Sequence, residues 1–163
     1  MTSIKDLLHE DLVIEDLKAT DKKGVIREFA ALLSAAGKVR DADELIRVVV
    51  ERESLGSTGI GDGVAIPHGK LPFIHEMIVA FGRSRQGVDF QSMDGKPVHL
   101  FFLLVTPEDS PGDHLRTLAR ISRILKNSPL RENLKNAADR QMLRSLIYDE
   151  DAKYPQVQAL QRK

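Results

Sequence analysis

Residues 98–105, Val-His-Leu-Phe-Phe-Leu-Leu-Val, decide the fold class of this 163-residue chain. Successive side chains of a β-strand point to opposite faces of the sheet, and here both alternating sets are apolar except at His99. A strand that is apolar on both sides lies in the middle of a sheet with other layers packed against each face. We expect His99 to be a hydrogen-bonded core histidine rather than a ligand.

Shorter strand signals precede this segment. Asp94-Gly95 is a hairpin-type turn, and Val88–Phe90 lies on its other side. The apolar runs 64–66 and 77–81 are short and bounded by Gly, Pro or Asp. The middle of the chain is therefore predicted to supply the strands of the sheet.

Helical patterns lie on either side of these strands. Before them, helices are expected to begin at Ser3, at Asp21 and at Asp41 or Asp43, whose side chains can cap a helix N-terminus. After them, apolar residues recur at helical spacing over 115–147. Helices before and after a group of strands predict a layered α/β fold with helices on both faces of the sheet. We expect one domain over residues 1–148 and a polar tail over 149–163.

Composition excludes several classes of protein. Lysine plus arginine and aspartate plus glutamate number 24 each, so no global field favours nucleic acid or an anionic membrane. No apolar run approaches the ~20 residues that span a bilayer, and the N-terminus has no secretory pattern. The absence of cysteine excludes disulfides, thiolate metal sites and cysteine nucleophiles. A cytoplasmic protein is the expectation.

The segment Gly59–Lys70, Gly-Ile-Gly-Asp-Gly-Val-Ala-Ile-Pro-His-Gly-Lys, places one histidine in a glycine-rich setting. Glycines leave room for a ligand to approach the backbone, and Pro67 fixes the direction in which the chain leaves the preceding strand. His68 is thereby placed to act as a nucleophile or as a ligand. Pro-His-Gly alone is an ordinary turn composition, so the tripeptide by itself does not decide the matter.

The whole segment resembles the active-site signature of the EIIA components of the bacterial sugar phosphotransferase system, in the mannitol, fructose and nitrogen-regulatory class. The signature positions are occupied here by Glu53, Ile60, Gly61, Val64, Ala65, Ile66, Pro67, His68 and Gly69. The resemblance continues through 87–90 and 94–105 to His114-Leu115 and covers roughly residues 4 to 148. It implies a mixed central sheet.

The resemblance also implies a chemistry and three catalytic residues. His68 would accept a phosphoryl group from a histidine phosphocarrier protein, by attack of Nε2 with Nδ1 bonded to a backbone carbonyl. Arg52 matches an active-site arginine at the end of the preceding helix, although it can instead pair with a neighbouring glutamate. His114 matches a second active-site histidine, and the expected helix start at Ser110 or Asp113 would place it where a helix dipole attracts anions.

Supporting roles are expected for Thr58, Gly59, Gly61 and Gly69 beside the phosphoryl group, although local turn bonding explains Thr58 equally well. His9 is expected at the surface. A metal-binding module using His68, His114 and an acidic residue is a distinct alternative, but no tight ligand spacing supports it. No cofactor and no metal are expected.

Two destinations for the phosphoryl group stay open. In a nitrogen-regulatory EIIA the phosphorylation state controls binding to other proteins, whereas a sugar-specific EIIA passes phosphate to a cysteine of an EIIB partner for uptake of fructose or mannitol. The lack of a fused EIIB or EIIC segment and the Ser-Thr-Gly-Ile-Gly sequence at 57–61 favour the regulatory form.

Overall fold

The computed structural model describes residues 3–154. The helices of this part are α1 (Ile4–Leu7), a 3-10 turn η1 (Glu10–Leu12), α2 (Lys22–Ala35), α3 (Ala42–Ser54), α4 (Pro111–Leu125), α5 (Ser128–Asn136) and α6 (Arg140–Asp151). The strands are β1 (Val13–Ile14), β2 (Gly59–Gly61), β3 (Val64–Ala65), β4 (His68–Leu71), β5 (Ile78–Val88) and β6 (Val98–Pro107).

Within the described residues, one six-stranded sheet has the order β1-β5-β6-β3-β2, and β4 pairs with β6 beyond the end of β3. Strands β1 and β5 are parallel, β5 and β6 are antiparallel, and both β3 and β4 run parallel to β6. The sheet is therefore mixed, as predicted. Its long antiparallel pair β5–β6 is joined through the turn at Asp94-Gly95, where Gly95 has φ +72°.

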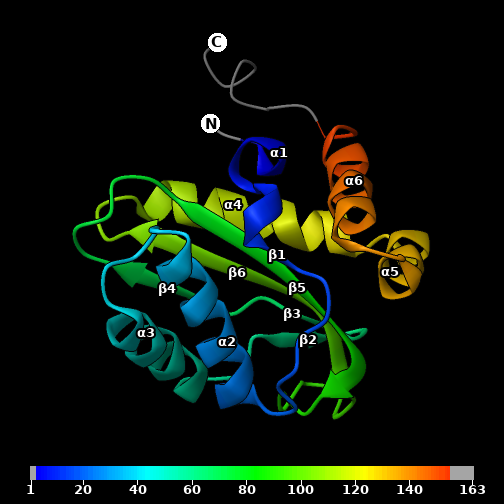
Figure 1. Cartoon of the computed structure of the whole chain (residues 1–163), viewed down its shortest axis with the longest axis horizontal. Helices are drawn as coiled ribbons and strands as arrows, with labels where there is room; N and C mark the ends of the chain where they lie inside the picture. Colours follow the sequence, from blue (N-terminus) through cyan, green and yellow to red (C-terminus); the bar gives the residue numbers. More distant parts are fainter. Residues whose placement is uncertain (1–2, 155–163) are drawn as a thin grey trace.

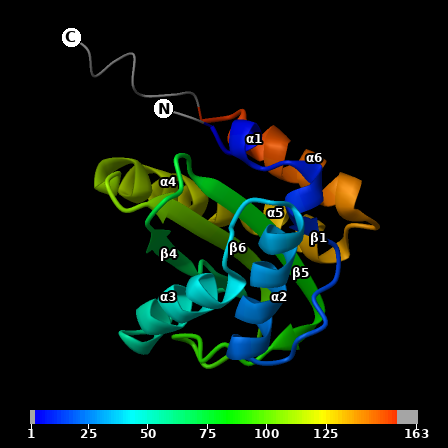
Figure 2. The same cartoon turned by 60° about the vertical axis from the view of Figure 1, so that its left-hand side comes forward.

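Helices cover both faces of this sheet, which confirms the predicted α/β architecture (Figures 1 and 2). Helices α2 and α3 lie together on one face, and α4 and α5 lie on the other. Helix α6 packs beside α1 and α5 near β1. The predicted helix starts hold, because Ser3, Asp21 and Asp41 each accept a backbone N–H of the first turn.

Strand β6 is the central strand that the apolar run 98–105 predicts. Every residue from Leu100 to Pro107 is buried, and Phe101 and Phe102 pack edge-on against Phe90 and Phe81. His99 is only partly buried, and its Nδ1 lies 2.8 Å from the carbonyl oxygen of Ser84. It is a hydrogen-bonded structural histidine, as expected.

Strand β4 borders the sheet and carries His68 at its first residue. Its alternation buries Gly69 and Leu71 beneath α3 and leaves the side chains of His68 and Lys70 on the opposite, more open side. A Cβ at Gly69 would lie 2.7 Å from Cγ1 of Val48, so only glycine allows α3 to approach β4 this closely. The packing of α3 on β4 sets the distance between Arg52 and His68.

Helix α6 runs past the domain boundary expected at residue 148 and continues to Asp151. Glu150 and Asp151 are buried. The Asp151 carboxylate is 2.6 Å from Nε of Arg120 and accepts the backbone N–H of Lys5. Sequence polarity suggested a loose tail here, but charged groups are buried when they are paired in this way. Residues 155–163 of the expected tail lie outside the described part of the chain.

Candidate active site

His68 is held by two hydrogen bonds that define its tautomer. Its Nδ1 is 2.8 Å from the carbonyl oxygen of Ile66, which can only accept, so Nδ1 carries the proton. Its Nε2 is 3.2 Å from Nε of Arg52, which can only donate, so Nε2 offers its lone pair. Both partners agree on a neutral ring that is nucleophilic at Nε2.

Arg52 reaches this ring from the last turn of α3. Besides the bond to His68, its Nη1 donates to the carbonyl oxygen of Gly56 at 3.0 Å. The alternative pairing of Arg52 with a neighbouring glutamate does not occur, since Glu51 pairs with Arg47 and Glu53 pairs with Lys22. The guanidinium is thus free of carboxylate partners among residues 3–154.

His114 comes to the same place from the other face of the sheet. It lies at the end of the first turn of α4, where its backbone N–H bonds to the carbonyl oxygen of Ser110. Its ring meets the ring of His68 edge-on, with 5.2 Å between centroids. Its Nδ1 lies 2.8 Å from Oγ1 of Thr106. Two imidazoles that are far apart in sequence therefore lie side by side in the structure.

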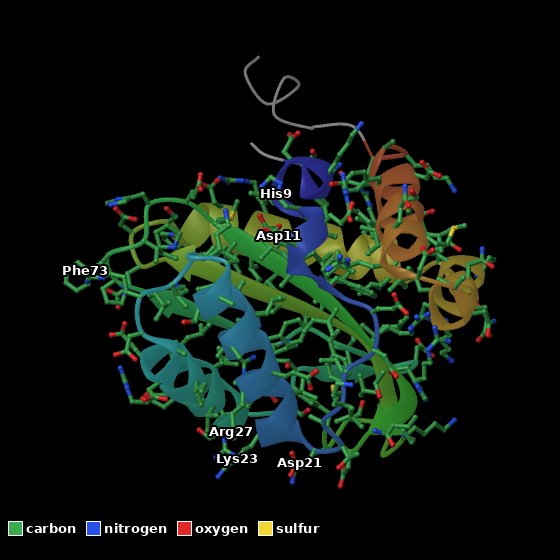
Figure 3. All side chains as sticks on the ribbon, in the orientation of Figure 1. His9, Asp11, Asp21, Lys23, Arg27 and Phe73 are labelled. Carbon is green, nitrogen blue, oxygen red and sulfur yellow. The ribbon has the colours of Figure 1, made fainter. Side chains whose placement is uncertain are left out.

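The three predicted catalytic side chains line one hollow of about 350 Å³, together with Val48, Gly69 and Lys70. The hollow is open to solvent and has two cationic side chains and two imidazoles in its wall. A hollow of about 450 Å³ is lined in part by Arg40 and by Phe73, which Figure 3 labels, but no histidine lines it. Of these two hollows, the smaller is the candidate site, because it combines an imidazole with donors for an anion.

Burial and the nearby cations keep both histidines neutral. Burial lowers the pKa of His68 below its usual 6.5, and the charge of Arg52 acts in the same direction. The Ile66 carbonyl and Glu53 oppose this shift. Burial, followed by the influence of His68, Lys70 and Arg52, lowers the pKa of His114 to about 4. At neutral pH each ring therefore has one donor and one acceptor nitrogen.

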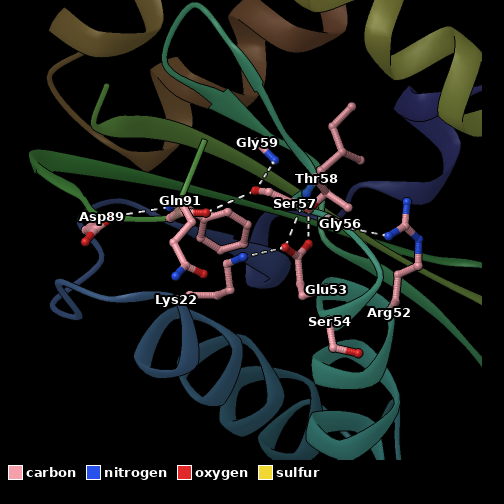
Figure 4. A network of polar contacts seen from close by, with 12 residues as sticks. Lys22, Arg52, Glu53, Ser54, Gly56, Ser57, Thr58, Gly59, Asp89 and Gln91 are labelled. Atoms are coloured by element: carbon pink, nitrogen blue, oxygen red, sulfur yellow. Dashed lines mark hydrogen bonds and ion pairs between the residues drawn. The ribbon is translucent and has the colours of Figure 1, made fainter. Parts of the chain in front are cut away.

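A buried network next to Arg52 fixes the C-terminal end of α3 (Figure 4). The Glu53 carboxylate is 3.0 Å from Nζ of Lys22 and accepts both the backbone N–H and the hydroxyl of Thr58. Lys22 also lies over the ring of Phe90, 4.9 Å from its centroid. Thr58 therefore acts on the protein's own helix end and not on the hollow, since its hydroxyl is bound to Glu53.

Gly59 and Gly61, which the sequence analysis expected beside the phosphoryl group, are not among the residues that line this hollow. Both belong to β2, which pairs antiparallel with β3, and a Cβ at Gly59 would contact Ser92. Backbone groups that pair in a sheet are not available to a ligand. Gly69, in contrast, lines the hollow as expected.

Sequence reasoning missed Thr106 and Lys22 as neighbours of the site. Thr106 contacts His114 and Lys22 contacts Glu53 only through long-range packing, and neither Thr106 nor Lys22 belongs to a sequence motif. The exposed position expected of His9 is confirmed (Figure 3). Within residues 3–154, no group of three His, Cys, Asp or Glu side chains is arranged to hold a metal ion, so no site of this kind supports the metal-binding alternative.

Comparison with known sequences decides the family. The model of the phosphoenolpyruvate-dependent sugar phosphotransferase system family EIIA 2 matches residues 6–150. The chain belongs to the EIIA 2 family. It is therefore a phosphotransferase component, and the match runs past residue 148 in agreement with the length of α6.

Two relatives show the breadth of this EIIA family. The chain is 40% identical to a nitrogen regulatory protein of Bradyrhizobium diazoefficiens over 88% of this chain and 94% of the relative. It is 36% identical to the fructose-specific EIIABC component of the phosphotransferase system in Bacillus subtilis, over 91% of this chain but 23% of that longer protein. The chain thus corresponds to nearly the whole of the first relative and to about a quarter of the second.

Solved EIIA structures share the fold. The nitrogen regulatory protein IIA-Ntr of Neisseria meningitidis superimposes with a TM-score of 0.82 at 33% identity, over 88% of this chain and 98% of that one. The IIA mannitol protein of Escherichia coli matches with a TM-score of 0.74 at 20% identity, over 85% of this chain and 97% of that one. None of the helices in residues 3–154 combines the length and apolarity that a bilayer crossing requires.

Proposed function

We propose that His68 carries a phosphoryl group on Nε2, received from a phosphorylated histidine phosphocarrier protein. The observation that supports this most directly is the pair of bonds at the ring, which leaves Nε2 as the only basic nitrogen and turns it toward Arg52 and the hollow. Imidazole suits a relay because it can attack phosphorus and later leave again.

The transfer is a displacement at phosphorus. The lone pair of His68 Nε2 forms the new N–P bond while the bond from phosphorus to the donor's ring nitrogen breaks, and the donor's imidazole leaves with that electron pair. The His68 ring becomes positively charged and keeps its proton on Nδ1, where the Ile66 carbonyl stabilises it. Attack requires Arg52 to release Nε2, after which its N–H groups are in reach of the phosphoryl oxygens.

Phosphate uptake by purified protein tests the assignment. The protein is incubated with phosphorylated carrier protein, and acid-labile phosphate is measured on the unaltered chain, on His68→Ala and on His99→Ala. His99 is a matched control, because its Nδ1 also lies 2.8 Å from a backbone carbonyl but it does not line the hollow. We expect labelling of the unaltered chain and of His99→Ala only. Labelled His68→Ala would refute the proposal.

Within this chemistry we infer a nitrogen-type regulatory role in the cytoplasm, since a nitrogen regulatory protein is 40% identical over nearly its full length. The alternative is a fructose-type EIIA that hands phosphate to an EIIB cysteine, which the fructose-specific relative at 36% identity favours. Mixing the phosphorylated chain with a fructose EIIB separates the two. Retained phosphate supports the regulatory role, and rapid transfer to the EIIB cysteine supports the sugar-specific role.

A further inference from the structure

The hydroxyl of Thr106 is the one side-chain group that holds Nδ1 of His114 within the described residues. Thr106 lies near the end of β6, is fully buried, and stands in register with Lys70 of β4. Its Oγ1 is 2.8 Å from His114 Nδ1. Because the neutral ring of His114 carries a single proton, the direction of this bond decides which ring nitrogen faces the hollow as a donor.

The number of protons and acceptors at this pair determines which partner donates the hydrogen bond. If His114 Nδ1 carried the proton, the Thr106 oxygen would accept it and the buried hydroxyl proton would have no acceptor among residues 3–154. An unused buried donor costs free energy. If Thr106 donates instead, its proton is used and the single ring proton of His114 moves to Nε2. The second arrangement leaves no donor unsatisfied at this pair.

The hydroxyl is needed because the surrounding charges favour the opposite tautomer. Arg52 and Lys70 line the hollow together with His114, and cations attract a lone pair. Without Thr106, the His114 ring would gain by turning an unprotonated Nε2 toward them. That lone pair would repel the oxygens of a phosphoryl group on His68, whose ring centroid is 5.2 Å away.

We propose that Thr106 is a positioning residue whose hydroxyl donates a hydrogen bond to His114 Nδ1. This bond keeps His114 in the tautomer that is protonated at Nε2, and that N–H donates a hydrogen bond to the phosphoryl group. The phosphoryl part of this inference rests on the proposed function of His68. The tautomer itself does not, since it follows from the contacts of the unphosphorylated protein.

The test measures the ring-nitrogen NMR signals of His114 in the full chain labelled with nitrogen-15 histidine, without any phosphate donor. Thr106→Val keeps the branched shape and removes the hydroxyl, Thr106→Ser keeps the hydroxyl, and Thr117→Val is the control. Thr117 of α4 is buried like Thr106, but its hydroxyl contacts the sulfur of Met77 and not His114. We expect a protonated Nε2 in the unaltered protein, in Thr106→Ser and in Thr117→Val, and a shift toward a protonated Nδ1 in Thr106→Val.

Phosphoryl transfer from the phosphorylated carrier is then measured on the same proteins. Loss of one neutral hydrogen bond predicts a transfer rate about three- to tenfold lower in Thr106→Val, restored by Thr106→Ser. A protonated Nδ1 in the unaltered protein overturns the proposal even where Thr106→Val fails to fold, as does an unchanged tautomer in Thr106→Val. If the tautomer responds as expected but the unaltered protein takes up no phosphate, only the proposed function fails.

Discussion

The guanidinium of Arg52 hydrogen-bonds the one ring nitrogen of His68 that has a lone pair for attack, with 3.2 Å between Nε and Nε2. In the unphosphorylated protein, the lone pair of His68 Nε2 is therefore occupied by a hydrogen bond from Arg52, the side chain best suited to bind a phosphoryl anion. This bond favours the His68 tautomer with an unprotonated Nε2. Under the proposed function, Arg52 would also supply positive charge to the phosphoryl group.

This dual role predicts that lysine cannot replace Arg52. Arg52→Lys keeps the charge but loses the planar set of donors, so we expect phosphoryl transfer to His68 to slow about 10- to 100-fold. Stopped-flow or quench measurements with phosphorylated carrier protein would show it. Arg47→Lys is the control on the same helix, because Arg47 is exposed and its ion pair is with Glu51. Equal rates for Arg52→Lys and the unaltered protein would contradict the role assigned to the guanidinium.

The lowered pKa of His114 makes stability depend on pH. With a folded pKa of about 4 and an unfolded value of 6.5, the unfolded chain binds more protons between these pH values. The free energy of unfolding therefore falls as pH drops from about 6.5 to 4 and stays constant for this group above that range. We expect a loss of about 1 to 2 kcal/mol, since solvent at the open hollow screens part of the shift.

Urea unfolding at pH 7 and at pH 4.5 measures this loss. His114→Gln, which cannot titrate, should lose less stability over the same interval than the unaltered protein. An identical loss in both proteins would mean that other groups, and not His114, carry the acid sensitivity.

The ion pair of half-buried Lys22 with buried Glu53 predicts a large effect of Glu53 on stability. Glu53→Ala leaves Lys22 without its partner and the donors of Thr58 unbonded, so we expect about 3 to 5 kcal/mol lower free energy of unfolding. Glu51→Ala, an exposed change two residues earlier, should stay within about 0.5 kcal/mol. Chemical denaturation of both variants provides the comparison, and equal midpoints would refute the structural role of the network.

The close packing of α3 on β4 at Gly69 predicts that this contact affects the rate of phosphoryl transfer. A Cβ at this position would lie 2.7 Å from Val48, so Gly69→Ala pushes α3 away from β4 and moves Arg52 from His68. We expect about 1 to 3 kcal/mol of destabilisation from overpacking, with slower transfer in the folded fraction. Gly112→Ala is the matched control, since its new Cβ would meet only the flexible end of Arg116. Normal stability and transfer in Gly69→Ala would contradict the close approach.

Local sequence rules predicted the elements whose causes are local. The caps at Ser3, Asp21 and Asp41 are satisfied within a few residues, so their helices begin where the sequence indicates. Strand β5 exceeds the expected run 77–81 and continues to Val88 through the polar stretch around Arg83. Arg83 is fully buried there, and its guanidinium donates to the carbonyl oxygens of Glu15, Leu134 and Ala137. Those partners are remote in sequence, so the local apolar pattern did not predict that the strand continues through Arg83.

The sequence by itself determined the layered α/β fold, through the two-sided apolar strand β6, and it singled out His68, Arg52 and His114 through spacing and resemblance. Only the tertiary structure decided that these side chains share one hollow, that Gly59 and Gly61 pair in a hairpin, and that Thr106 reaches His114. The physical reason is that patterns of hydrophobicity and capping act over a few residues. The partners of a ring nitrogen are set by α3 and α4 packing against strands that come from distant parts of the chain.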